Sequence, residues 1–354
     1  MTDAPTASAA PTEPTKPIEP TAPRTWAYGT RPWLPGASRL DDVRPRTRVI
    51  VDNDFAGDPD DLFQLAHHLL VEGTEVRGVV VSRLRENDAW NRTDSSIRAG
   101  RERVETLLTA MGVTGIDLHD GDDRGFDAYD GPTDASRFIV EEAMRDDDRP
   151  LYLVAGGSLG DAARAYRAEP AIAERLTLIW IGGSEHAGLA WVPEGATTLE
   201  YNMALDIASA MYVFNETRAR IWQMPRDVYR SAQVSLPVIR RGCTAAGALG
   251  RYLLEQLEGV RSMMAGMGVH PGATYVLGDQ PLVLLSSLQT TFEPDTASSY
   301  DIVPTPQLAE DGTYRYPQET RPMRRYRRID NNLLFDDMFA SFTALADWLE
   351  GGDS

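Results

Sequence analysis

Short apolar segments alternate with longer amphipathic segments along the chain after Arg46. The short segments are nearly continuous runs of Val, Ile, Leu and other apolar residues, which is typical of strands buried on both faces of a sheet. The longer segments repeat apolar residues at the spacing of one helix face. The expected strands are residues 47–54, 76–82, 150–157 and 177–184, and the expected helices are residues 60–73, 97–112, 135–147 and 159–176.

This alternation predicts an α/β fold, because parallel strands are joined by helical crossovers. We expect a Rossmann-like, mainly parallel sheet that is flanked by helices on both faces. No linker-like break and no repeat of fixed period interrupts the pattern, so residues 46–350 are expected to form a single domain.

Residues 1–45 differ from the rest of the chain because they are rich in Pro, Thr and Ala. A segment of this composition buries too little apolar surface to offset its chain entropy, so we expect a disordered tail and lead-in. The segment has no apolar stretch after a basic start, which a secretory signal would have. We therefore expect a cytoplasmic protein.

The charge and the residue types narrow the functional classes. A formal net charge of −18 argues against a nucleic-acid or anionic-membrane partner, because either one needs a basic face. Lys16 is the only lysine and lies in the tail, which excludes Schiff-base, P-loop and kinase-type lysine chemistry in the folded part. Cys243 is the only cysteine, which excludes a disulfide framework and a Cys-rich metal site.

The first expected strand ends in a cluster of acidic residues. The apolar run at 49–51 is followed by five carboxylates, those of Asp52, Asp54, Asp58, Asp60 and Asp61. In open parallel sheets a ligand lies beyond the carboxyl ends of the strands. Pairs of glycines follow two later strands, at 156–157 and 182–183, and let the backbone approach such a ligand.

Carboxylates this close together repel one another unless a cation or shared protons lie between them. A hard divalent cation such as Ca²⁺ or Mg²⁺ would compensate the charge, because both ions prefer oxygen ligands. The alternative is a set of solvated aspartates at a helix N-terminus, and we favour it for Asp58 alone. For Asp52, Asp54, Asp60 and Asp61 together, the position at a strand end favours a metal site.

Two common motifs do not fit this cluster. An EF-hand loop that began at Asp52 would need Glu at its twelfth position, where the chain has Phe63. A phosphatase with an aspartate nucleophile also has D-x-D after its first strand, but a small hydroxylic residue usually follows soon after. Phe55 and the missing lysines count against that assignment.

The sequence resembles the nucleoside hydrolases in four segments, which occur in the order of that family. The acidic residues at 52–61 resemble the family motif D-x-D-x-x-x-D-D, with a longer connecting loop. Residues 150–184 resemble the strand, G-P-L-T-N turn, helix and strand of the family. Residues 199–215 resemble its E-F-N-x-x-x-D-P-E-A-A segment, and residues 275–285 resemble its late H-D-P-L segment.

This resemblance implies Ca²⁺-dependent hydrolysis of the N-glycosidic bond of a nucleoside or nucleoside analogue, giving ribose and a free base. Asp54 would be the base that takes a proton from a metal-bound water. The family also implies a homo-oligomer, either a dimer or a tetramer. The implied ligands of the ion are Asp54, Asp61, Asp279 and the backbone carbonyl of Gly160. The implied sugar-binding residues are Asp60, Glu200 and Asn202, and Asp52 is implied to brace Asp54 without contacting the ion itself.

The chain departs from the family at residues that would bind the base. The family's histidine before the late aspartate, which helps to protonate the leaving base, is replaced by Gly278. Aromatic rings that stack on the base could take its place, and the candidates are Trp90, Trp191, Trp222 and Tyr275. The asparagine that follows the second strand in the family is also missing, and Asn87 or Asn91 could substitute for it.

These departures leave three functions open. The first is hydrolysis of nucleosides, the second is hydrolysis of another pentosyl or glycosyl compound, and the third is Ca²⁺-dependent binding of a sugar or nucleoside without turnover. The retained acidic residues favour an enzyme, because a chain that did not need the metal would have little reason to keep so unfavourable a cluster.

Overall fold

The computed structural model describes residues 24–34, 45–90, 93–290, 292–293 and 295–351. Asn91 and most of the predicted tail therefore lie outside the described residues. Within the described part, no helix is long and apolar enough to cross a membrane.

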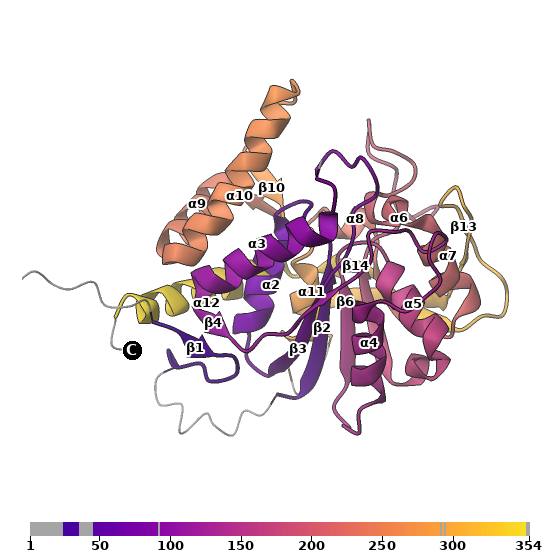
Figure 1. The fold of residues 1–354 in the computed structure, drawn as a ribbon. Coiled ribbons are helices and arrows are strands. Elements are labelled where there is room, and N and C mark those ends of the chain that lie inside the picture. Colours follow the sequence, from indigo (N-terminus) through magenta and orange to yellow (C-terminus); the bar gives the residue numbers. More distant parts are fainter. Residues whose placement is uncertain (1–23, 35–44, 91–92, 291, 294, 352–354) are drawn as a thin grey trace, which may run out of the picture.

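An 8-stranded sheet runs through the centre of the molecule (Figure 1). Its strands are β2 (Thr47–Asn53), β3 (Thr74–Val81), β5 (Leu118–Asp120), β6 (Leu151–Ala155), β7 (Leu176–Ile181), β8 (Arg220–Met224), β11 (Ser298–Pro304) and β14 (Pro322–Ile329). They are arranged in the order β11-β14-β8-β7-β6-β2-β3-β5. Only the pair β11 and β14, at one edge, is antiparallel. The prediction of a mainly parallel sheet is confirmed.

Helices cover both faces of this sheet. One core contains residues of α2 (Asp60–Leu70), α3 (Ser96–Met111), α9 (Leu236–Ala245), α10 (Gly247–Gly266), α11 (Pro281–Ser286) and α12 (Asn331–Leu349). The other contains residues of α4 (Asp134–Met144), α5 (Gly160–Ala168), the 3₁₀ helix η1 (Pro170–Glu174) and α7 (Ile207–Glu216). Side chains of a strand alternate between the two faces, so Val49 and Val51 lie in the first core and Ile50 lies in the second.

Residues 24–34 are folded, which corrects the prediction that all of residues 1–45 are disordered. The strand β1 (Trp26–Ala27) pairs with β4 (Val113–Thr114). Trp26 and Trp33 are 3% and 5% exposed, and their rings meet edge to face with centroids 4.7 Å apart. Aromatic side chains bury a large apolar area, so two of them hold a segment whose average composition predicts disorder.

The chain reverses its direction of travel across the sheet at β2. From β2 it continues to β3 and β5 on one side, and it then returns to β6 on the other side of β2. The adjacent parallel strands β2 and β6 therefore form the topological switch point, where open α/β sheets bind their ligands.

Candidate active site

A cavity of about 360 Å³ opens at this switch point, beyond the carboxyl ends of the central strands. It is lined by Asp54 after β2, by Gly156 after β6, by Ile181 at the end of β7 and by Arg226 after β8. A volume of this size is suited to a small molecule. The structure therefore places the acidic motif in the wall of the cavity, as the sequence predicts for a ligand site.

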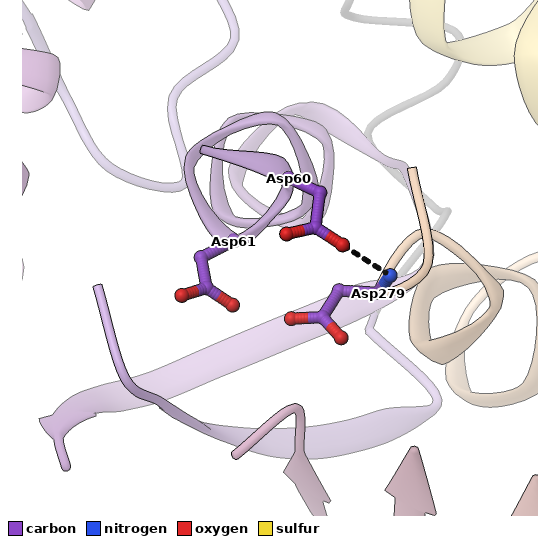
Figure 2. Close-up of side chains that lie close together, drawn as sticks. All are labelled: Asp60, Asp61 and Asp279. Carbon is purple, nitrogen blue, oxygen red and sulfur yellow. Dashed lines mark hydrogen bonds between the residues drawn. The ribbon is translucent and has the colours of Figure 1, made fainter. Parts of the chain in front are cut away.

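Three carboxylates face one another in this cavity (Figure 2). Asp60 and Asp61 are the first residues of α2, and Asp279 lies in the turn before α11. One carboxylate oxygen of each lies within 4.8 Å of the others. The backbone N–H of Asp279 donates a hydrogen bond to Oδ2 of Asp60 at 3.2 Å, which Figure 2 shows as a dashed line. Asp61 and Asp279 are thus brought together as predicted, and Asp60, predicted to bind the sugar, joins them.

Asp54 lies in the same cavity and is close enough to Asp60 and Asp61 to interact with both. Oδ2 of Asp54 and Oδ2 of Asp61 are buried without a hydrogen-bond donor among the described residues. A buried carboxylate oxygen without a partner is unfavourable unless a cation or a proton compensates it. Both oxygens are therefore available to a ligand.

Burial of the cluster shifts its titration towards neutral pH. Burial, followed by the charge of Asp60, raises the pKa of Asp54 to about 7. Burial also raises the pKa of Asp60 to about 6, although backbone N–H groups partly oppose the shift. The pKa values of Asp61 and Asp279 are raised well above their usual range by burial and by neighbouring carboxylates. Without a cation, the cluster holds protons at a pH where exposed aspartates have lost them.

Asn53 braces the cluster, a role that the sequence analysis missed. Its Nδ2 lies 3.0 Å from Oδ1 of Asp61, 3.1 Å from Oδ2 of Asp279 and 3.1 Å from Oε1 of Gln64. Its Oδ1 accepts a hydrogen bond from the backbone N–H of Gly156 at 3.0 Å. The available signals were that strand side chains alternate, which turns Asn53 away from Asp52, and that Gln64 follows Asp61 by about one helical turn.

Asp52, which was predicted to brace Asp54, has other contacts. Its Oδ1 accepts a hydrogen bond from the hydroxyl of Ser82. Burial and the nearby carboxylates of Asp161 and Asp54 raise its pKa well above the usual range. Asp161 lies on α5, whereas the acidic cluster lies beside α2. Among the described hydrogen bonds, it is Asn53 that reaches the cluster.

The glycines after β6 make room for the acidic side chains. A Cβ at Gly156 would overlap Oδ2 of Asp279 and would lie 2.9 Å from Oδ1 of Asn53. A Cβ at Gly157 would lie 3.1 Å from Cγ of Asp54. The close approach that the sequence analysis expected at these glycines is made by the carboxylates of the site.

Glu200 and Asn202 both line the cavity at a second wall. Glu200 caps the short helix α6 (Tyr201–Leu205), because its carboxylate accepts hydrogen bonds from the backbone N–H groups of Asn202 and Met203. Nδ2 of Asn202 donates to the carbonyls of Gly156 and Ile181 at 2.7 Å and 2.9 Å. The second wall is thus tied to the ends of β6 and β7.

Three predicted site residues lie elsewhere. Trp191 is 95% exposed and does not line the cavity. Asn87 has a left-handed backbone, with φ of 56°, and lines a different hollow. Gly160 begins α5 and is not among the residues that line the cavity, and the role of its backbone carbonyl stays a prediction. Exposure and loop direction depend on distant contacts, which a local motif does not encode.

Asp58 is not the solvated residue that the sequence analysis expected. It is half-buried, lines the cavity and accepts a hydrogen bond from the hydroxyl of Tyr275 at 2.6 Å. Of the other aromatic candidates, Trp90 lines the cavity, whereas Trp222 lies against Tyr152 on the sheet.

Comparisons with known proteins agree with this fold. A curated relative, the inosine-uridine preferring nucleoside hydrolase of Crithidia fasciculata, is 28% identical over 128 residues. The match spans 35% of this chain and only 38% of that relative. No family model matches the chain.

Solved structures match over a much longer part of the chain. The inosine-uridine preferring nucleoside hydrolase from Bacillus anthracis aligns with a TM-score of 0.60 and 16% identity, covering 84% of this chain and 99% of that one. A plant nucleoside hydrolase aligns with a TM-score of 0.64 and 13% identity, also covering 84% and 99%. The chain has the fold of the nucleoside hydrolases, and the resemblance predicted from its motifs is confirmed.

Proposed function

We propose that this chain hydrolyses the N-glycosidic bond of a nucleoside or nucleoside analogue, releasing the base and the sugar, and that it requires Ca²⁺. The observation that carries the proposal is the buried carboxylate cluster of Asp54, Asp60, Asp61 and Asp279 in a cavity at the switch point of a nucleoside hydrolase fold. The partial sequence match to a curated nucleoside hydrolase supports the same reaction class.

The residues of the cluster fit a hard divalent cation. Asp60, Asp61 and Asp279 each offer an oxygen in a common space, and Oδ2 of Asp54 and of Asp61 has no hydrogen-bond donor among the described residues. An all-oxygen donor set of this kind suits Ca²⁺, which tolerates irregular coordination better than Mg²⁺ does. Asp54, Asp61 and Asp279 are the residues that we propose to hold it.

A bound cation would supply Lewis-acid chemistry, because it lowers the pKa of water and orients it. Asp54 would accept the proton of the attacking water, since its Oδ2 is free of other donors. The carboxylates would stabilise the positive charge that develops on the sugar as the bond breaks. Replacing Asp54 with Asn removes the proton acceptor, and we expect kcat to fall by about 10²- to 10⁴-fold.

The test is a thermal-shift titration of the chelated protein with Ca²⁺, followed by base release from a panel of nucleosides. Ca²⁺ that binds only the folded state raises the melting temperature by mass action. It adds about 2.7 kcal/mol to the free energy of unfolding when the free Ca²⁺ concentration is 100 times Kd. We expect Asp61→Ala to abolish both the shift and base release.

Asp311→Ala is the matched control, because Asp311 is exposed and does not line the cavity. It should keep the wild-type shift. A Ca²⁺-dependent rise in melting temperature of equal size in Asp61→Ala would contradict the metal assignment. The absence of any rise in the wild type would contradict it as well. The homo-oligomeric state and the cytoplasmic location remain predictions, which light scattering and cell fractionation would test.

A further inference from the structure

A series of hydrogen bonds extends from the acidic cluster along the buried side of α2. Asp61, Gln64 and His68 follow one another on one face of this helix, because residues three and four positions apart lie on the same side. Oε1 of Gln64 lies 3.1 Å from Nδ2 of Asn53, and Nε2 of Gln64 contacts Nδ1 of His68. Asn53, Gln64 and His68 are all fully buried. Gln64 and His68 do not line the cavity, so their effect on the site passes through Asn53.

Ser286 fixes which nitrogen of the His68 ring carries the hydrogen. Nε2 of His68 lies 2.9 Å from Oγ of Ser286, and the Ser286 hydroxyl donates its only hydrogen to the carbonyl of Leu282 at 2.7 Å. The Ser286 oxygen is therefore an acceptor for His68, and Nε2 must carry the hydrogen. Burial lowers the pKa of the His68 imidazole to about 3, so the ring is neutral and Nδ1 is an acceptor.

The direction of the remaining hydrogen bonds follows from this nitrogen. An acceptor at Nδ1 of His68 requires Gln64 to turn its NH₂ group towards the ring, which leaves Oε1 of Gln64 facing Asn53. Asn53 then presents its own NH₂ group to Gln64 and to two carboxylates of the cluster. The opposite tautomer of His68 would place the NH₂ groups of Gln64 and Asn53 against each other. The His68 ring therefore determines which end of the Asn53 amide meets the carboxylates.

We propose that His68 is a positioning residue, which holds the Asn53 amide in the orientation that keeps Asp61 and Asp279 together and thereby sets the affinity of the site for a divalent cation. The inference rests on the proposed function, because that cation is the Ca²⁺ proposed there. An Asn53 amide that was turned over would present an oxygen to both carboxylates, and ionised carboxylates only accept hydrogen bonds. Residues that orient metal ligands without touching the metal typically change its affinity by about 10- to 100-fold when they are removed.

The experiment measures the Kd of Ca²⁺ by isothermal titration. His68→Leu removes the acceptor and frees the Gln64 amide to turn, so Kd should rise by about 10-fold. His68→Asn supplies a carbonyl oxygen as the acceptor in place of Nδ1, so Kd should stay within about 3-fold of the wild type. The control is His186→Leu, because His186 is also buried, contacts Gln223 and Tyr316 through its ring nitrogens and does not line the cavity. This variant should lose stability without a change in Kd.

A double-mutant cycle with Gln64→Met shows whether His68 acts through Gln64. Gln64→Met keeps the length of the side chain and removes both of its polar groups, so Kd should again rise by about 10-fold. His68→Leu should add nothing further in this background, because the connection to Asn53 is already broken. Additive increases in Kd would overturn the inference, as would an unchanged Kd in His68→Leu. Equal increases in His68→Asn and His68→Leu would overturn it too, because packing of the ring would then explain both.

The tautomer of His68 is measured directly by ¹⁵N NMR of the protein labelled at histidine. The signals of His68 are identified by their loss in His68→Asn. The form with hydrogen on Nε2 is expected, in the metal-free and in the Ca²⁺-loaded protein. The form with hydrogen on Nδ1 would overturn the inference, and this test holds even if His68→Leu does not fold.

Failure of the proposed function can be told apart from failure of this inference. If the wild type binds no Ca²⁺, the metal proposal fails, and the cycle is measured instead on the free energy of unfolding in chelator, with Asn53→Ala and His68→Leu. No described hydrogen bond joins Asn53 and His68 directly. Combined losses smaller than the sum of the two would support the positioning of Asn53 by His68 through Gln64. Additive losses would overturn it.

Discussion

A single neutral amide organises the acidic site at the scale of residues. The Nδ2 group of Asn53 has two hydrogens and lies within 3.1 Å of three acceptors, which belong to Asp61, Gln64 and Asp279. An amide can approach carboxylates that would repel another carboxylate, so it fixes their positions without adding charge. The remaining charge is left to a cation or to protons, and these two outcomes differ in their dependence on pH.

We predict that the metal-free protein loses stability as the pH rises from about 4 to about 7. The pKa of Asp54 is about 7 in the folded protein, whereas an unfolded aspartate has a pKa of about 3.9. Between these values the folded state holds more protons than the unfolded state, so this contribution is fully present below the unfolded pKa and disappears as the pH passes the folded one. Urea unfolding in chelator at a series of pH values would measure it.

Asp54→Asn provides the comparison, because its side chain does not titrate. The slope against pH should be smaller in this variant. His68 contributes in the opposite direction, since burial lowers its pKa to about 3 and its contribution is lost as the pH falls below about 6.5. His68 is present in both proteins, so its effect cancels in the difference. Equal slopes in the two proteins would contradict the prediction for Asp54.

At the scale of elements, the residue at the end of β6 limits how closely the turn before α11 can approach the sheet. A side chain at residue 156 would overlap Asp279. The turn before α11 can therefore approach the end of this strand only because residue 156 is glycine. The requirement is steric, because it arises from the missing Cβ.

We predict that Gly156→Ala weakens the Ca²⁺-dependent thermal shift strongly, because the new methyl group displaces the carboxylate of Asp279. Isothermal titration with Ca²⁺ should show at least a 10-fold increase in Kd. Gly259→Ala is the matched control: Gly259 lies within α10, and its added Cβ meets no atom within 4 Å. That variant should keep the wild-type Kd and gain about 0.5–1 kcal/mol of stability from helix propensity. An unchanged Kd in Gly156→Ala would show that Asp279 does not hold the ion.

The same elements show how far the sequence predicts this site. The strands and the acidic motif were predictable because an apolar run and the residues that follow it are local features. Asn53 was missed because its role depends on Asp279, which lies far away in the sequence. Trp191 was chosen for its residue type, but whether an aromatic ring is buried depends on tertiary contacts.

At the scale of the whole molecule, two apolar cores lie on either side of one sheet, and the site lies at an end of the strands that they share. The N-terminal segment adds to the first core through Trp26 and Trp33, although its composition suggested a tail. Fold and site are therefore coupled through β2 and β6, which reach both cores and end at the acidic cavity.

The distance along the chain between the two halves of the site has a consequence for the order of events in folding. Asn53 and Asp279 are 226 residues apart, so their contact forms only after a long stretch of chain has closed. Until these two segments meet, an ion finds an incomplete set of ligands. We expect Ca²⁺ to bind after the rate-limiting step of refolding, which leaves the refolding rate unchanged and slows unfolding. Stopped-flow refolding and unfolding with and without Ca²⁺ would test this expectation. Faster refolding with Ca²⁺ would mean that the segments of Asn53 and Asp279 meet before the rate-limiting step.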